Sequence, residues 1–237
     1  MPPLHPGLPS HRPLAIAHRG GNTIEDAQRT IALGCDLIET DIWYRNGHLE
    51  LRHKHRLGPL PILWERWSLA LAINQLKLDD LLDTIDEDSL LFLDLKGEEE
   101  ELGPAIVEEM RRTRPGHRIA LCGRCYPQLD AVLGEPDVTV FYSVGEEREW
   151  PEAWPRLEAM PWPALSLHRK LATPATMDRL NAMGATVVCW AVNTVSDARR
   201  LREMGVSGFT SDNLALLRQL VEKGDAALEE TATPSTR

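Results

Sequence analysis

The residues that could carry out chemistry in this sequence stand at the ends of short β-type runs. His18 closes the apolar run that begins at Leu14, and Arg19 follows it directly. Because side chains alternate along a strand, His18 is expected on the face of Leu14 and Ile16, the face toward a barrel axis. A histidine in that position can donate or accept a proton near neutral pH.

Two carboxylates share one face of the next predicted strand, where Glu39 and Asp41 alternate with Ile and Thr. Side by side in a partly buried site, they repel each other unless protons or a divalent cation neutralise them. Hard oxygen ligands suit Mg²⁺ or Ca²⁺ better than a soft metal. Asp94 shares a face with Lys96 in a later run, and we expect Asp94 to complete the metal site.

A second histidine, His53, lies in an additional predicted strand on the apolar face of Leu49 and Leu51. Trp190 shares a face with Thr186 and Val188 in a later predicted strand and lies near the rim. A lone inward histidine is more often a hydrogen-bonded core residue than a catalyst. Two histidines, three carboxylates, an arginine and a lysine at one set of strand ends are better explained by an active site. We therefore predict His18 and His53 as its acid and base.

The elements that position these residues alternate between β-type runs and helical patterns, which indicates a parallel sheet built from βα units. The predicted strands are 14–18, 36–42, 90–96, 118–122, 138–142, 164–167, 186–191 and 208–211. The predicted helices are 22–33, 100–112, 126–133, 173–183, 195–204 and 213–222. Eight such units close a barrel, so the fold class is α/β, a single (β/α)₈ TIM barrel with its active site at the C-terminal ends of the strands.

A single folded domain is expected, because 237 residues with 43% hydrophobic content can bury one full core. The barrel is predicted over 14–223 after an N-terminal extension, 1–13. Residues 43–88 form an insertion after strand two that is expected to cap the barrel mouth, with a strand over 48–53 and a helix around 78–85. Residues 224–237 have few apolar side chains and are predicted to be a disordered tail.

The charge balance bears on the class of partner. The chain has 36 acidic and 26 basic residues, a formal charge of -10, which repels nucleic acid and anionic membrane surfaces. A small phosphate-bearing substrate would then need local positive charge from Arg, Lys or a bound cation. No apolar stretch reaches about 18 residues, the N-terminus lacks a signal-peptide pattern, and four cysteines are too few for a disulfide framework. We expect a cytoplasmic protein without a membrane span.

The ordered motifs resemble those of the glycerophosphodiester phosphodiesterase family. The matching residues are His18-Arg19-Gly20 with Asn22-Thr23, Gly34-Cys35-Asp36, Ile38-Glu39-Thr40-Asp41, Asn46-Gly47 leading to His53, Leu93-Asp94-Leu95-Lys96, Trp190-Ala191-Val192-Asn193, Gly205-Val206-Ser207-Gly208 and Ser211-Asp212. The resemblance spans roughly residues 14 to 222, and the ordered set is specific although each short motif alone is weak.

The resemblance implies cleavage of a phosphodiester to a phosphomonoester, sn-glycerol 3-phosphate, and an alcohol. It implies a divalent metal, Mg²⁺ or Ca²⁺, on the three carboxylates and a phosphodiester substrate bound by Arg19, Lys96 and Trp190. Lys54 stands where the family usually has Asp, and the loop before Asn22 lacks the usual Pro-Glu. Two alternatives therefore stay open: a lysophospholipase D-like or sphingomyelinase D-like lipid phosphodiesterase, and a non-catalytic phosphate-binding barrel. Asn22 with Glu25 also fits a helix capping box.

Overall fold

The structure is a computed structural model that describes residues 8, 12–56, 62–65, 68–71 and 75–229. It divides into two compact units. The N-terminal unit comprises Arg19–Ala32 and Ile38–Tyr142, and the C-terminal unit comprises Met1–His18, Leu33–Leu37 and Ser143–Arg237. Each unit contributes four parallel strands that alternate with helices along the chain.

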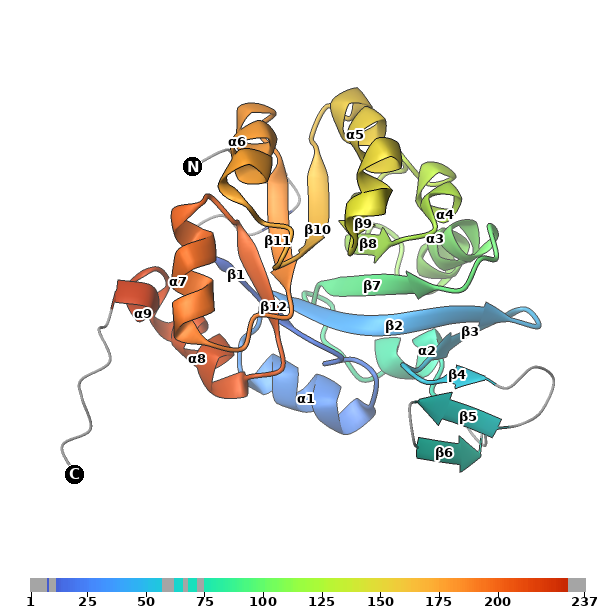
Figure 1. Cartoon of the computed structure of the whole chain (residues 1–237). Helices are drawn as coiled ribbons and strands as arrows, with labels where there is room; N and C mark the ends of the chain where they lie inside the picture. Colours follow the sequence, from blue (N-terminus) through green and yellow to red (C-terminus); the bar gives the residue numbers. More distant parts are fainter. Residues whose placement is uncertain (1–7, 9–11, 57–61, 66–67, 72–74, 230–237) are drawn as a thin grey trace. The chain divides into compact units, whose positions relative to one another are not determined.

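The sheet of the N-terminal unit has the order β9-β8-β7-β2-β3. Figure 1 shows β7 beside β2, with the short β3 continuing the sheet. The strands are β2 (Leu37–Arg45), β3 (His48–Leu51), β7 (Leu91–Lys96), β8 (Ile119–Gly123) and β9 (Val138–Val144). β3 is antiparallel to β2, and the other pairings are parallel. The register places Asp41 opposite Asp94, so strand pairing brings the two predicted carboxylates together.

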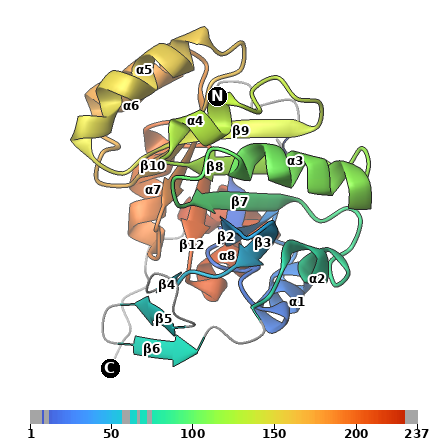
Figure 2. The same ribbon diagram turned by 90° about the vertical axis from the view of Figure 1, so that its right-hand side faces the viewer.

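The helices of this unit are α1 (Ile24–Ala32), α2 (Leu78–Leu82), α3 (Leu102–Thr113) and α4 (Tyr126–Asp130). The insertion also forms a small antiparallel sheet, which Figure 2 shows as a group apart from the larger sheet of the same unit. Its strands are β4 (His55–Arg56), β5 (Ile62–Glu65) and β6 (Ser68–Leu71). The sequence did not predict these three strands, because each is only two to four residues long.

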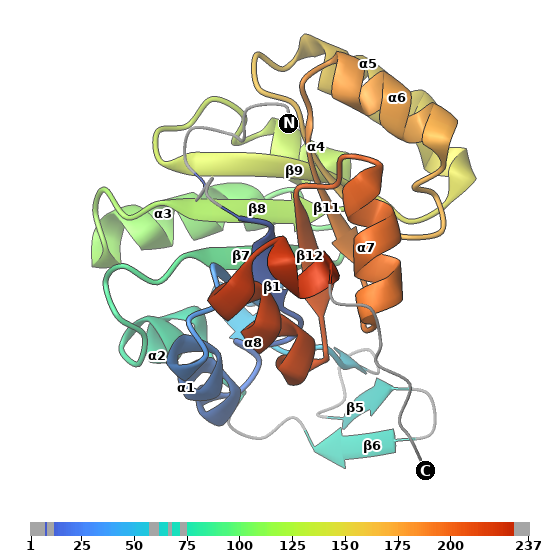
Figure 3. The ribbon, with the colours of Figure 1, turned by 90° about the vertical axis from the view of Figure 1, so that its left-hand side faces the viewer.

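The C-terminal unit has the parallel order β1-β12-β11-β10, and Figure 3 shows β1 beside β12 with α8 packed against them. The strands are β1 (Leu14–Ala17), β10 (Ala164–His168), β11 (Thr186–Trp190) and β12 (Gly208–Ser211). The helices are α5 (Trp150–Ala159), α6 (Pro174–Ala182), α7 (Val195–Glu203), α8 (Leu214–Lys223) and α9 (Ala226–Glu229), with a 3₁₀ turn over Glu147–Glu149.

The strands are buried on both faces, as expected where helices cover a parallel sheet. All four residues of β1 and all five of β8 are buried. In the N-terminal unit the rings of Phe92 and Phe141 meet edge to face at 5.2 Å. None of the helices in the described ranges is long and apolar enough to cross a membrane. The longest, α3, has 12 residues, against the roughly 20 that a bilayer requires.

All eight predicted barrel strands and all six predicted helices are confirmed, with ends displaced by a few residues. α5 was not predicted, because Pro151 and Pro155 interrupt its helical pattern; Pro151 stands in the first turn, where a missing N–H donor costs little. The predicted disordered tail is wrong for residues 224–229. There α9 buries Ala227 and Leu228. Residues 1–7, 9–11 and 230–237, the rest of both predicted terminal segments, lie outside the described residues.

The contact between α3 and α4 leaves no room for a side chain at Gly103. A Cβ there would lie 2.1 Å from the carbonyl oxygen of Gln128. We expect Gly103→Ala to lower the free energy of unfolding by about 2–3 kcal/mol, measured by chemical denaturation. Gly47→Ala is the control, because Gly47 has φ +78° but no atom within 4 Å of its Cβ position, and should cost about 1 kcal/mol. Equal losses would contradict the steric explanation.

Candidate active site

Three carboxylates of the N-terminal unit form one cluster. Glu39 and Asp41 are buried on β2, and Asp94 lies opposite Asp41 on β7. Each side chain offers an oxygen atom, and these oxygens lie within 4.8 Å of one another. The period of two along β2 and the parallel register of β7 are sufficient to produce this arrangement.

Lys96 supplies the positive charge beside this cluster. Its Nζ donates to Asp41 Oδ1 at 2.9 Å and pairs with Asp94 as well. Burial alone would lower the pKa of Lys96, but Asp94 and Asp41 raise it well above its usual range. Burial would likewise raise the pKa of Asp41, but the hydrogen bond from His53 and the charge of Lys96 hold it well below its usual range. Asp41 is therefore ionised and Lys96 is charged at neutral pH.

Glu39 has the opposite electrostatic environment. Burial first, and then the charges of Asp41 and Asp94, raise its pKa well above the ordinary value. The backbone N–H of Arg19 donates a hydrogen bond to its carboxylate, which only partly offsets that rise. Without a further cation, Glu39 is thus the carboxylate of the cluster that holds a proton most readily.

His53 connects the carboxylate cluster to Arg19. Its Nδ1 lies 3.0 Å from Asp41 Oδ2, and its Nε2 lies 2.6 Å from Nη2 of Arg19. The ionised Asp41 can only accept, so Nδ1 carries a proton, whereas a guanidinium can only donate, so Nε2 presents its lone pair. In this geometry His53 carries a proton on Nδ1 and presents Nε2 as the nitrogen that can accept one.

Asn22 orients Asp41, a role that the sequence did not indicate. Its side-chain oxygen accepts from the backbone N–H of Asp41 at 2.9 Å and from Thr40 Oγ1 at 2.6 Å. Its Nδ2 donates to Asp41 Oδ2 at 2.8 Å. The predicted capping box with Glu25 is therefore wrong. Thr23 caps α1 instead, because its Oγ1 accepts from the N–H of Asp26 at 3.1 Å.

Arg19 is held in a backbone conformation that favours glycine, with φ 56°. Such a conformation is unfavourable for a residue with a side chain and persists where the surroundings hold it in place. Here the N–H of Arg19 bonds to Glu39, its carbonyl accepts from the N–H of Asn22 at 3.1 Å, and its guanidinium reaches His53. The turn therefore positions both the backbone and the side chain of Arg19.

The C-terminal unit contains the other histidine. His18 follows β1, and its Nδ1 lies 2.6 Å from Asp212 Oδ1. Asn193 orients that carboxylate, because its Nδ2 donates to Asp212 Oδ2 at 3.1 Å and its Oδ1 accepts from the N–H of Asp212 at 2.9 Å. Asn193 and Asp212 both belong to motifs named in the sequence analysis, but the contact of Asp212 with His18 could not be predicted, since 194 positions separate the two residues.

Trp190 lies half-buried at the C-terminal end of β11, in register with His168 at the end of β10. The two rings meet edge to face at 4.9 Å. Burial first, then the cations Lys170 and Arg169, lower the pKa of His168. This pair therefore presents an indole and a neutral imidazole at the strand ends of this unit.

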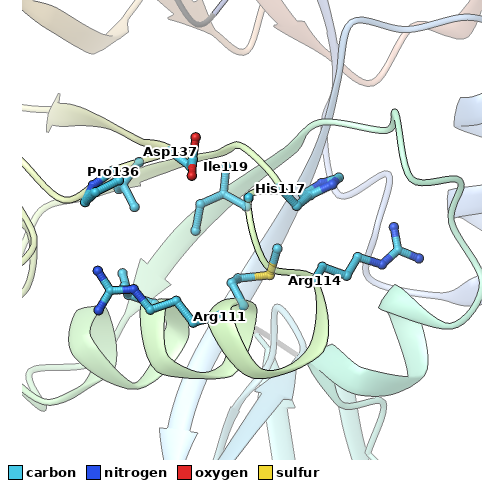
Figure 4. Close-up of a pocket in the computed structure, with 10 residues that line it drawn as sticks. Arg111, Arg114, His117, Ile119, Pro136 and Asp137 are labelled. Atoms are coloured by element: carbon cyan, nitrogen blue, oxygen red, sulfur yellow. The ribbon is translucent and has the colours of Figure 1, made fainter.

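A cavity of about 60 Å³ lies elsewhere in the N-terminal unit. Figure 4 shows it between the C-terminal part of α3 and the starts of β8 and β9, with Arg111, Arg114 and His117 around it. Arg111 pairs with Glu135, and Arg114 donates to backbone carbonyls that include that of Ile85. In this fold class the start of a strand contributes to stability rather than to chemistry, so we assign the cavity no catalytic role.

The raised pKa of Glu39 predicts a pH-dependent stability. The folded protein holds this proton to higher pH than the unfolded chain, so stability falls as the pH rises from about 4 toward the folded pKa. In chelator, Glu39→Gln should therefore raise the free energy of unfolding at pH 7 by on the order of 1 kcal/mol and leave it unchanged near pH 4. Exposed Glu87→Gln is the control. A gain of equal size at both pH values would contradict this.

Comparison with known proteins connects the site to a family. The model of the glycerophosphoryl diester phosphodiesterase family matches residues 128–216. This segment includes Trp190, Asn193 and Asp212 but none of the site residues between His18 and Lys96. No curated protein shows a significant sequence match to the chain.

Solved structures share the fold at low sequence identity. A phosphodiesterase from Oleispira antarctica, solved with the product sn-glycerol-3-phosphate, is 21% identical with a TM-score of 0.71, covering 92% of this chain and 98% of its own. A glycerophosphodiester phosphodiesterase from Thermotoga maritima is 17% identical, with a TM-score of 0.69 and coverage of 89% and 99%. A glycerophosphodiester phosphodiesterase from Parabacteroides distasonis is 16% identical, with a TM-score of 0.68, covering 90% of this chain and 98% of its own. The chain thus has the predicted (β/α)₈ barrel fold, and its residues 128–216 match the family that its motifs resemble.

Proposed function

We propose that this protein is a metal-dependent phosphodiesterase that hydrolyses glycerophosphodiester-like substrates to sn-glycerol 3-phosphate and an alcohol. The observation that carries the proposal is the position of His53, which holds a lone pair at Nε2 beside Arg19 while Asp41 of the carboxylate cluster binds its other nitrogen. The family match over residues 128–216 and the glycerol phosphate bound to the Oleispira antarctica structure support the substrate class.

His53 is the general base in this proposal. Arg19 covers its Nε2, and a phosphate oxygen would compete for the same guanidinium donors. Once Arg19 turns to the phosphate, the lone pair of His53 can take the proton of an adjacent substrate hydroxyl that attacks phosphorus. The bond to the leaving alcohol then breaks, and water opens the resulting cyclic phosphate to the phosphomonoester. Asp41 keeps the ring in the required tautomer and stabilises the imidazolium that forms.

His18 is the general acid. Its Nδ1 faces Asp212, a carboxylate that stabilises the protonated ring, and Nε2 is the atom that would give its proton to the leaving alcohol. Asn193 is a positioning residue, because it acts on His18 through Asp212. The two histidines are assigned different roles because both face a carboxylate at Nδ1, but His53 also meets a guanidinium at Nε2.

The donor set of Glu39, Asp41 and Asp94 fits a hard divalent cation such as Mg²⁺ or Ca²⁺. The three offer only oxygen ligands, and the pKa of Glu39 is raised by burial first and then by the charges of Asp41 and Asp94, which Lys96 offsets only in part. A bound divalent ion would polarise a phosphoryl oxygen. Lys96 keeps Asp41 ionised, and together with Arg19 it provides the positive charge that an acidic chain otherwise lacks.

Trp190 and His168 are proposed to contact the alcohol portion of the substrate, since an indole edge and a neutral imidazole suit a small polyol.

A lysophospholipase D-like activity is the alternative, and turnover of lysolipids against water-soluble glycerophosphodiesters distinguishes the two. A non-catalytic barrel would hydrolyse neither. The cytoplasmic location expected from the sequence stays a prediction.

The metal site predicts how divalent binding responds to substitution. Asp41→Asn and Asp94→Asn should each weaken Mg²⁺ or Ca²⁺ binding, measured by titration calorimetry, by at least about tenfold, because each removes a charged ligand. Asp79→Asn is the matched control, since Asp79 lies on α2 outside the cluster. Chelator should abolish phosphodiester hydrolysis. Undiminished affinity in both cluster variants would exclude this site.

The two histidines predict a kinetic pattern. His18→Ala and His53→Ala should each lower kcat by ~10² to 10⁴ with little change in affinity for glycerol phosphate, and the double variant should lose little more, because both serve one transition state. Exposed His48→Ala is the control. Asp212→Asn should follow His18→Ala in direction but with a smaller loss. Full activity in His18→Ala would refute the mechanism.

A further inference from the structure

His53 lies just beyond the end of a strand. The antiparallel pairing of β2 and β3 ends at Leu51, and the backbone N–H of Arg52 then donates to the carbonyl oxygen of Asp41 at 3.0 Å. His53 follows this bond, outside the strand, and its Nδ1 lies 3.0 Å from Asp41 Oδ2. The placement of the ring therefore depends on what holds residues 52–54.

The side chain of Arg52 holds this segment. Its Nη1 donates to the carbonyl oxygen of Lys54 at 2.6 Å, and its Nε donates to Glu50 Oε2 at 3.0 Å. The side chain thus connects a residue before His53 to the residue directly after it. A guanidinium can do this because its N–H donors lie in one plane and point in different directions.

Trp43 holds Arg52 in turn. Alternation along β2 puts Trp43 on the same face as Glu39 and Asp41, nearer the end of the strand. Its indole Nε1 donates to the carbonyl oxygen of Arg52 at 2.8 Å, and Cζ of Arg52 lies 4.4 Å from the centroid of the indole ring. The two residues are therefore joined by a hydrogen bond and a cation–π contact. We call this pair the Trp43–Arg52 clamp.

The burial of Arg52 needs an explanation other than stability. Arg52 is only 6% exposed, and burial lowers the pKa of its guanidinium while the hydrogen bond with Glu50 raises it. A buried ion pair gains in attraction about what it loses in hydration, so apolar side chains of similar volume would stabilise the fold as well. Apolar side chains could not bind the carbonyl of Lys54. The position of Arg52 is better explained by the segment that it holds.

We propose that Trp43 and Arg52 are positioning residues for the general base. The Trp43–Arg52 clamp keeps Nδ1 of His53 against Asp41, so that Nε2 remains the nitrogen that accepts the proton. The hydrogen bond made by one ring nitrogen determines where the proton of an imidazole resides, so a ring that leaves Asp41 loses this preference. The role of the clamp rests on the proposed function of His53, and neither clamp residue touches the substrate.

Two conservative substitutions test the clamp in the full-length protein. Arg52→Lys keeps the charge but does not reproduce the two side-chain bonds of the planar guanidinium, and Trp43→Phe keeps a ring but removes the N–H donor. Each should lower kcat for a water-soluble glycerophosphodiester by about 10- to 100-fold and change KM by less than about twofold. In a His53→Ala background neither should lower kcat further, because both act through His53.

A second cation–π pair provides the matched control. In the C-terminal unit Cζ of Arg179 lies 3.8 Å from the ring centroid of Trp154, and Arg179 pairs with Glu158. Arg179→Lys and Trp154→Phe alter the same kinds of contact but should leave kcat unchanged, since α5 and α6 carry none of the proposed site residues. Circular dichroism verifies that each variant is folded.

The ring of His53 can also be observed without catalysis. Long-range proton–nitrogen NMR correlations report which ring nitrogen carries the proton, at about pH 9 where an unperturbed imidazole is neutral. The signal of His53 is identified by its loss in His53→Ala. We expect the Nδ1–H form in the parent protein and an increased fraction of the Nε2–H form in Arg52→Lys and Trp43→Phe.

Three results would overturn the proposal. One is an unchanged tautomer in both clamp variants, or a kcat within about twofold of the parent while His53→Ala is impaired. Another is a raised KM with kcat preserved, which would mean that the clamp residues contact the substrate. The third is an equal loss in the His53→Ala background or in the two controls, which would mean a general effect on folding. If His53→Ala itself keeps full kcat, the proposed function fails, whereas the tautomer still decides whether the clamp positions the ring.

Discussion

Three carboxylates of the N-terminal unit offer oxygen atoms within 4.8 Å of one another, and the side chains around them are arranged to offset their repulsion. Their mutual repulsion in a buried strand end is unfavourable unless cations or protons offset it. Lys96 offsets part of it by bonding Asp41 and Asp94, and the proton favoured on Glu39 offsets another part. A divalent cation bound to the three carboxylates would replace that proton and complete the neutralisation of their charge.

The hydrogen bonds around the cluster follow from the same constraint. Asp41 accepts from Asn22, His53 and Lys96, so each of its oxygens has a donor and the carboxylate stays charged. The turn at Arg19 presents an N–H to Glu39, which accounts for a left-handed residue that is not glycine. The contacts with Asp41 and Arg19 thus determine which ring nitrogen of His53 carries the proton, and therefore which nitrogen can accept another one.

The two histidines have the same kind of hydrogen-bond partner at Nδ1 but differ in their other neighbours. Each turns Nδ1 toward an aspartate that an asparagine orients, Asp41 with Asn22 and Asp212 with Asn193. His53 also meets the guanidinium of Arg19 at Nε2. In the mechanism proposed above, these different neighbours accompany different roles, a base for His53 and an acid for His18.

The sequence by itself determined the features that depend on short-range periodicity. Alternation placed Glu39 and Asp41 on one face of β2 and Asp94 with Lys96 on one face of β7, and the eight βα units indicated the barrel. Only the tertiary structure decided that Asp212 reaches His18, that Asn22 binds Asp41 rather than capping a helix, and that residues 226–229 form a helix. The physical reason is how far apart in the sequence the interacting residues lie. The alternation of side chains along a strand depends only on neighbouring residues, whereas a hydrogen bond between residues 19 or 194 positions apart depends on how distant segments come together.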